Sequence, residues 1–216
     1  MKQVRVSTLE SFRRFRDNVT DTFDTEEALI AKLRGEFHGN FKTQIGTAFH
    51  YLVEHTTMST VQYDEFLKMG VDFSVEQKEI AYNHSFNLVP FIPEVRHEKV
   101  YKVGKYTLSV TGCTDVLQGN TLRDTKCKFS PPSLTDYYDS YQWRLYLSIF
   151  GLNRFIYDIF EFVGYKDEMG RNVSNLALKQ QAPFECISYE NMETDINTLI
   201  LHFCEWLSFR NLWHLI

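Results

Sequence analysis

The chain has 216 residues, a formal net charge of −5, and hydrophobic and charged fractions of 44% and 24%, which are ordinary for a soluble globular protein. This length supports one hydrophobic core, so we expect a single domain spanning residues 1–216. No apolar run approaches the roughly 20 residues that cross a bilayer, and residues 1–6 lack the apolar stretch of a signal peptide. These absences predict a cytosolic protein with no membrane partner.

The first part of the chain is predicted to be helical. Ser7 precedes an amphipathic stretch and has Glu10 at the third position after it, which matches a capping box. Gly35 is the expected stop of a second helix, and residues 39–46 are expected to form a loop. The predicted helices cover residues 9–15, 25–35, 47–57 and 59–86, with Pro90 and Pro93 breaking the pattern after the last.

From residue 99 onward the pattern changes to short runs rich in Val, Tyr, Thr and Leu, separated by glycines. Such runs predict an antiparallel meander, followed by a helix that ends at Gly151 and then by further strands and a helix. Helices before and after a meander indicate a layered α/β or α+β domain. The predicted strands cover residues 99–103, 106–118, 121–129, 155–163 and 186–189, and the predicted helices cover 135–150 and 190–206.

A predicted hairpin carries the residues best suited to chemistry. Gly119-Asn120 fits a two-residue type II′ turn, and a register fixed on that turn places Asp115 opposite Asp124. Opposed carboxylates repel each other, and Mg²⁺ or Mn²⁺ would relieve that repulsion. Lys126 shares a face with Asp124, so the patch could bind a metal, hold a water and stabilise a charged phosphate. The same register pairs Gln118 with Thr121, Leu117 with Leu122, and Val116 with Arg123.

Two predicted helices offer further site residues. His50 and Glu54 are four apart and share a helical face, so His50 could supply a metal ligand from outside the sheet. A lone helical histidine is more often structural or exposed. Gln142 and Tyr146 are also four apart, and both could contact a nucleic-acid strand. From the residues alone, a packed amphipathic helix is the favoured interpretation of that second pair.

In chain order, these segments resemble the PD-(D/E)xK nuclease superfamily, and specifically its RecB-like exonuclease branch. The resemblance runs from about residue 7 to residue 163 and implies a restriction-endonuclease-like core, a mixed β-sheet with an antiparallel meander flanked by helices. The matching segments are the helix opening Ser7–Phe15, the Gly-to-His segment Gly46–Glu54, the "G-x-x-D" segment Gly112–Asp115, the "D-x-K" segment Asp124–Lys126 and the "Q-x-x-x-Y" segment Gln142–Tyr146.

The sequence departs from the family in three respects. The link between Asp115 and Asp124 is short, so the hairpin is compact. The cysteine pattern of the iron–sulfur members is absent, which predicts no cluster. No Walker motif is present, so any helicase would be a separate chain.

The resemblance implies a DNA exonuclease of recombination, repair or phage type, acting on a single- or double-stranded end. The sequence leaves the oligomeric state open: a homo-oligomer would be one way to gain processivity, and a helicase or recombination partner would be a separate chain. The implied ligands for Mg²⁺ or Mn²⁺ are His50, Asp115, Asp124 and the carbonyl of Thr125. Lys126 would position or activate the attacking water beside Asp115 and Asp124. Gln142 and Tyr146 would contact the substrate strand.

Two other functions stay open. The chain could be a nucleic-acid-binding module that keeps the fold without cutting, although the complete set of site residues argues against a decayed site. It could also be an assembly or regulatory protein, which the acidic net charge slightly favours. That last alternative predicts no effect of divalent metal on the melting temperature, whereas a preformed metal site gains stability as metal is added.

Overall fold

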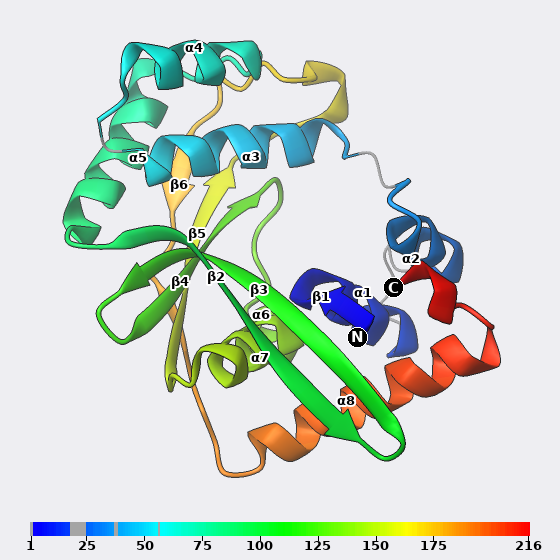
Figure 1. Cartoon of the computed structure of the whole chain (residues 1–216). Coiled ribbons are helices and arrows are strands. Elements are labelled where there is room, and N and C mark those ends of the chain that lie inside the picture. Colours follow the sequence, from blue (N-terminus) through cyan, green and yellow to red (C-terminus); the bar gives the residue numbers. More distant parts are fainter. Residues whose placement is uncertain (1, 18–24, 37–38, 56) are drawn as a thin grey trace.

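The computed structural model describes residues 2–17, 25–36, 39–55 and 57–216, which fold into a mixed β-sheet with helices on both faces (Figure 1). None of the helices in these ranges has the length and apolar character needed to span a bilayer. The helices are α1 (Val6–Arg16), α2 (Glu26–Leu33), α3 (Phe41–Glu54), α4 (Thr60–Lys68), α5 (Val75–Leu88), α6 (Leu134–Asp139), α7 (Tyr141–Phe150) and α8 (Met192–Phe209). The strands are β1 (Lys2–Arg5), β2 (Ile92–Val103), β3 (Tyr106–Gln118), β4 (Thr121–Lys128), β5 (Arg154–Phe162), β6 (Leu178–Gln180) and β7 (Phe184–Ile187).

The sheet has the order β1-β3-β4-β5-β6, with β2 paired to β3 and β7 paired to β5. Strands β2, β3 and β4 form the predicted antiparallel meander. Strand β5 runs parallel to β4, because α6 and α7 carry the chain back across the sheet before β5 begins. The predicted α/β class is therefore confirmed, and the arrangement is consistent with a restriction-endonuclease-like core.

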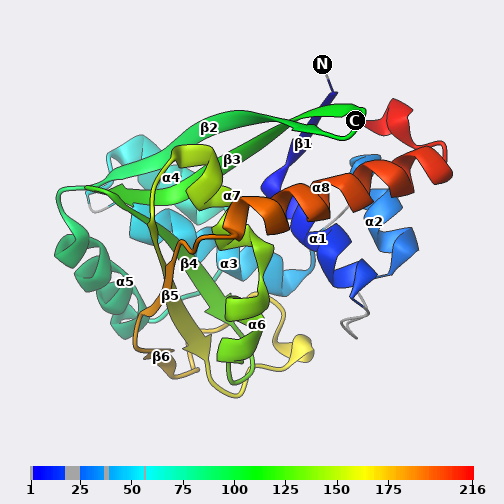
Figure 2. The ribbon, with the colours of Figure 1, turned by 90° about the horizontal axis from the view of Figure 1, so that it is seen from below.

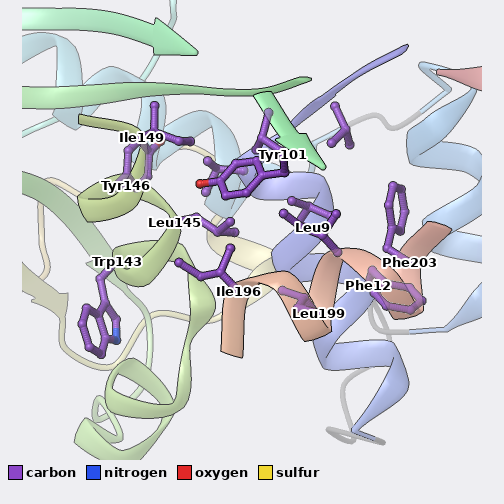
Figure 3. Packing of buried hydrophobic residues seen from close by; sticks show 14 of the residues in the cluster. Leu9, Phe12, Tyr101, Trp143, Leu145, Tyr146, Ile149, Ile196, Leu199 and Phe203 are labelled. Atoms are coloured by element: carbon purple, nitrogen blue, oxygen red, sulfur yellow. The ribbon is translucent and has the colours of Figure 1, made fainter. Parts of the chain in front are cut away.

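Two hydrophobic clusters cover opposite faces of the sheet. Figure 2 shows α1, α7 and α8 on one side of the strands and α3 and α4 on the other. Strand β5 contributes to both clusters, since Phe155 and Tyr157 belong to the first and Phe160 and Phe162 to the second. Burial on both faces is why this strand reads as an almost continuous apolar run. Figure 3 shows the first cluster, where Leu145 of α7 lies near Ile196 and Leu199 of α8 and Leu9 of α1.

Helix α3 begins earlier than predicted. The expected loop over residues 39–46 is wrong, since α3 starts at Phe41 and continues through Gly46. Asn40 caps the helix by accepting a hydrogen bond from the Thr43 N–H at 3.0 Å. The buried stripe of Ile45, Ala48, Phe49 and Val53 holds the helix against the second cluster, and this packing outweighs the weak helix propensity of one glycine.

The predicted capping box at Ser7 is also wrong. Helix α1 starts at Val6, directly after β1, and its N-cap Arg5 makes no side-chain capping bond. The Glu10 carboxylate instead accepts hydrogen bonds from the Arg13 side chain at 2.6 Å and from the Tyr141 N–H at 2.8 Å. Glu10 therefore links α1 to the start of α7.

The predicted helix over residues 135–150 is divided in two at Ser140, which has an extended backbone with φ −61° and ψ 135°. The Ser140 hydroxyl accepts a hydrogen bond from the Gln142 N–H at 3.1 Å and so caps α7. Gly151 ends α7 in the left-handed conformation, with φ 66°, as predicted. The break at Ser140 places Gln142 in the first turn of α7.

Candidate metal centre

The hairpin between β3 and β4 has the predicted register only near its turn. Gln118–Thr121, Leu117–Leu122 and Val116–Arg123 are paired, and Gly119 has the positive φ of 57° that a type II′ turn requires. The ladder ends at Val116–Arg123, so Asp115 and Asp124 are not directly paired as predicted. The Asp115 Oδ2 atom instead accepts a hydrogen bond from the Thr125 N–H at 2.8 Å. Strand β4 nevertheless stays paired with β5 along its whole length.

Helix α3 packs beside β3 and β4 and brings two side chains to Asp115 (Figure 1). The Nδ1 atom of His50 lies 3.3 Å from the Asp115 Oδ2 atom. Glu54 follows one helical turn later, and ligand atoms of His50, Glu54 and Asp115 all lie within 4.8 Å of one another. Glu54 was not among the predicted ligands, although its spacing of four from His50 placed it on the same helical face.

Asp124 lies beside this triad and is held by two other predicted site residues. The Nζ atom of Lys126 is 2.6 Å from Asp124 Oδ2, and the Gln142 side chain donates a hydrogen bond to Asp124 Oδ1 at 2.9 Å. Asp124 is only 4% exposed, so both contacts replace water around its carboxylate.

Tyr146 packs against strand β3, and its hydroxyl group is already engaged in a hydrogen bond. Its O–H donates to the Cys113 carbonyl at 2.8 Å, and the residue is 7% exposed. A Cβ added at Gly112 would lie 2.8 Å from the Tyr146 ring, so only glycine allows this close approach. The glycine of the "G-x-x-D" segment thus makes room for the tyrosine of the "Q-x-x-x-Y" segment.

Burial shapes the charges of the triad. Burial, together with the nearby Lys126 cation, lowers the pKa of His50 to about 4, although Asp124 and the Thr125 backbone act in the opposite direction. His50 is therefore a neutral imidazole at pH 7, which is the form that binds metals. Burial and the proximity of Glu94 raise the pKa of Glu54 to about 7.

The remaining charges show why a cation would be favourable. Burial and the neighbouring Asp124 raise the pKa of Asp115 well above its usual range. Burial works against the charged form of Lys126, but Asp124 and Asp115 outweigh it and raise the pKa of that ammonium, so Lys126 stays cationic. Two crowded carboxylates beside one neutral imidazole form a donor set that suits Mn²⁺, and its oxygen atoms suit Mg²⁺.

Two residues near the triad come from β2 and were not found from the sequence. Glu94 and Arg96 line the same cavity as His50, Glu54 and Asp115. Glu94 has a positive φ of 50°, a conformation that a non-glycine side chain adopts at a cost of about 1–2 kcal/mol.

No family model matches the chain, and no curated protein matches it. Two solved structures are similar to it at low sequence identity. One is the protein SSO0001, with 15% identity, a TM-score of 0.45, and coverage of 93% of this chain and 73% of that chain. The other is a phage-related exonuclease from Haemophilus somnus 129PT, with 14% identity, a TM-score of 0.48, and coverage of 92% and 89%. The function proposed next rests on the geometry of the metal centre.

Proposed function

We propose that the chain is a divalent-metal-dependent nuclease that hydrolyses phosphodiester bonds of DNA. The observation that carries the proposal is the triad of His50, Glu54 and Asp115, whose ligand atoms lie within 4.8 Å of one another, next to the ion pair of Asp124 and Lys126. During attack on a phosphodiester, negative charge grows on the phosphate oxygens. A metal held by the triad, together with the ammonium group of Lys126, would stabilise that charge.

Each residue has a distinct task in this proposal. His50, Glu54 and Asp115 would hold Mg²⁺ or Mn²⁺, with Asp124 beside them, and the Thr125 carbonyl is the further ligand that the resemblance implies. When bound there, a divalent cation would supply Lewis acidity toward water and the phosphate.

Lys126 and Gln142 act on the same carboxylate from two sides. Lys126, charged at neutral pH, orients the attacking water or stabilises the phosphate oxygens. Gln142 fixes the Asp124 carboxylate through its 2.9 Å hydrogen bond. Tyr146 fixes strand β3 through the Cys113 carbonyl, which supports Asp115 two residues later.

The order of the site residues along the chain supports a DNA exonuclease of recombination, repair or phage type. His50 on a helix, Asp115 and Asp124 on consecutive strands and Gln142 on the next helix follow the order of the RecB-like motifs. Mg²⁺ or Mn²⁺ is the proposed cofactor, and a DNA end is the proposed substrate.

A cleavage assay tests this function directly. End-labelled linear DNA and covalently closed circular DNA, each single- and double-stranded, are incubated with Mg²⁺, with Mn²⁺ or with EDTA. We expect metal-dependent loss of linear DNA, reduced by about 100-fold or more in Lys126→Ala, which removes the cation beside the reacting phosphate, and in Asp124→Ala, which removes the carboxylate that holds Lys126. Asp64→Ala on the exposed face of α4 is the matched control and should cut normally.

Other outcomes would change the proposal in defined ways. Cleavage of circles would keep the site and make the protein an endonuclease. Full metal-dependent cleavage in both Asp124→Ala and Lys126→Ala would overturn the assignment of the site. DNA binding without cleavage under any metal would favour the binding module, and RNA would then be the next substrate.

A further inference from the structure

Three connected cavities lead away from the metal centre along β2 and β3. A cavity of about 360 Å³ contains His50 and Asp115 and is also lined by Arg96. A smaller cavity of about 160 Å³ shares Arg96 with it and adds Arg5 and Tyr146. A third, of about 650 Å³, shares Arg5 and Arg96 with the second. Because each cavity shares lining residues with the next, the three lie side by side, and we call this row of cavities the outer groove.

The groove also continues on the opposite side of the metal centre. There, a cavity of about 910 Å³ shares His50 with the first cavity and is lined by Lys126, Lys128 and Lys42. Lys42 also pairs with Asp167 at 3.0 Å. The metal centre therefore lies in the middle of the groove, with basic side chains on both sides of it.

The charge of the outer groove suits a polyanion. Arg5 and Arg96 are exposed there, and Lys32 is half-buried with its ammonium bonded to the Ser7 carbonyl. The acidic side chain in this stretch, Glu98, accepts hydrogen bonds from Gln3 at 3.1 Å and Ser109 at 3.3 Å. This local excess of cations occurs on a chain whose net charge is −5.

The middle cavity of the outer groove is the smallest of the three. The cavity of about 160 Å³ is bounded by Arg96 on β2 and by Tyr146, whose ring is fixed against Gly112 and whose hydroxyl is held by Cys113. Proteins that bind single strands without sequence preference commonly use a positively charged groove that follows the backbone.

We propose that a single DNA strand lies along this groove with nucleotides on both sides of the metal centre, and that Arg5 and Arg96 bind its phosphates on the outer side. The inference rests on the proposed function, because it places the scissile phosphate at the triad. Since the groove continues past the triad, the strand extends beyond the bond that is cut. The products are therefore oligonucleotides.

Binding without metal tests the groove separately from cleavage. Fluorescent oligothymidylates of increasing length are titrated with the wild-type protein in EDTA, at several salt concentrations. Affinity should rise with length until the strand spans the groove, and a duplex of the same length should bind more weakly. The slope of the logarithm of the association constant against the logarithm of salt concentration is negative. Arg5→Gln and Arg96→Gln should each make it less steep by about 0.7, the value for one lost phosphate contact on a single strand.

Matched variants separate charge from folding. Lys102→Gln changes an exposed cation on the same strand as Arg96, outside these cavities, and should leave the slope unchanged. Arg96→Lys should restore the slope, which a merely structural role of the guanidinium would not explain.

The possible results distinguish the two proposals. Three results would overturn the proposed path of the strand even if the protein cuts DNA. These are unchanged slopes in both Arg5→Gln and Arg96→Gln, tighter binding of the duplex, and release of mononucleotides only. Strand binding that depends on Arg5 and Arg96, with no cleavage under any metal, would keep the groove and overturn the nuclease.

Discussion

Glu54 provides the sharpest test at the scale of single residues, because its carboxylate completes the triad with His50 and Asp115. We expect Glu54→Gln to weaken Mn²⁺ binding by at least the roughly 10- to 100-fold that is lost when supporting residues of metal sites are changed. Isothermal titration of the folded protein with Mn²⁺ measures this loss. Glu79→Gln on the exposed side of α5 is the control, and equal affinities in both variants would remove Glu54 from the site.

Gly112 tests how the strand is fixed beneath the triad. An added Cβ would lie 2.8 Å from the Tyr146 ring, so Gly112→Ala should lower the free energy of unfolding by about 1–3 kcal/mol through overpacking. Urea denaturation measures the change. In the control, Gly46→Ala, the nearest atom to the added Cβ is the Cys127 Cβ at 3.9 Å, and a helical alanine should stabilise the protein by about 0.5–1 kcal/mol. Similar destabilisation in both variants would contradict this account.

Local patterns predicted part of the site and could not predict the rest. Asp115, Asp124 and Lys126 followed from strand alternation and one turn, although the strands separate before Asp115 and Asp124 can pair. Glu54 was within reach of the same reasoning, through its spacing from His50. Arg96 was not, because it reaches the site only through the pairing of β2 with β3, where it lies opposite Cys113.

At the scale of elements, a buried charge network joins β4, β5 and α5. Arg123 on β4 donates two hydrogen bonds to Asp158 on β5, at 2.6 and 2.8 Å. The Nε2 atom of His84 on α5 lies 3.6 Å from the same carboxylate. Burial alone would raise the pKa of Asp158, but the contacts with His84 and Arg123 hold it below its usual range.

Asp158→Asn should therefore destabilise the protein by about 3 kcal/mol at neutral pH, since it leaves the Arg123 charge buried without its partner. Because the folded pKa of Asp158 is depressed, its contribution is complete above the unfolded pKa of about 3.9 and is lost as pH falls through the folded value. The difference between wild type and variant should thus shrink below about pH 4 in urea denaturation. Glu185→Gln, which breaks the exposed pair with Arg154, should cost less than about 1 kcal/mol.

A difference from wild type that stayed constant down to the lowest pH would contradict the role given to the Asp158 charge. If Glu185→Gln lowered the free energy of unfolding as much as Asp158→Asn does, burial would not decide the strength of these ion pairs.

The longer elements were predictable because their apolar periodicity extends over several turns or residue pairs. Strands β3, β4 and β5 lie close to their predicted ranges, whereas β2 begins at Ile92 and continues through Pro93, well before the predicted start at residue 99. Strands β1 (Lys2–Arg5) and β6 (Leu178–Gln180) are too short to show a pattern, and only their pairing with β3 and β5 makes them strands. Helix α3 was started too late because a glycine outweighed the apolar stripe in the prediction.

At the scale of the whole molecule, the two hydrophobic clusters share β5, so we expect them to unfold together. Trp143 lies in the first cluster, and Trp206 and Trp213 pack against it, so tryptophan fluorescence reports that cluster. Far-UV circular dichroism reports all helices, including α3 and α5 on the other face. Coincident urea transitions by both probes are expected for the single domain that we propose.

Separate urea transitions would instead divide the chain into two folding units. The homo-oligomer and the separate helicase or recombination partner stay predictions. Size-exclusion chromatography with light scattering is the direct measurement of the first.

The outer edge of β2 has a consequence for how copies of the chain meet. In the described part of the chain, β2 pairs with β3 on one side and with no strand on the other, so its outer backbone groups could extend a sheet from another copy. Pro93 and the charged Glu94, Arg96 and Glu98 along this strand oppose such growth. Arg96, which we propose to bind a phosphate, thus also helps to keep neighbouring molecules apart, and removing several of these charges at once should convert a monodisperse preparation into one that aggregates as its concentration rises.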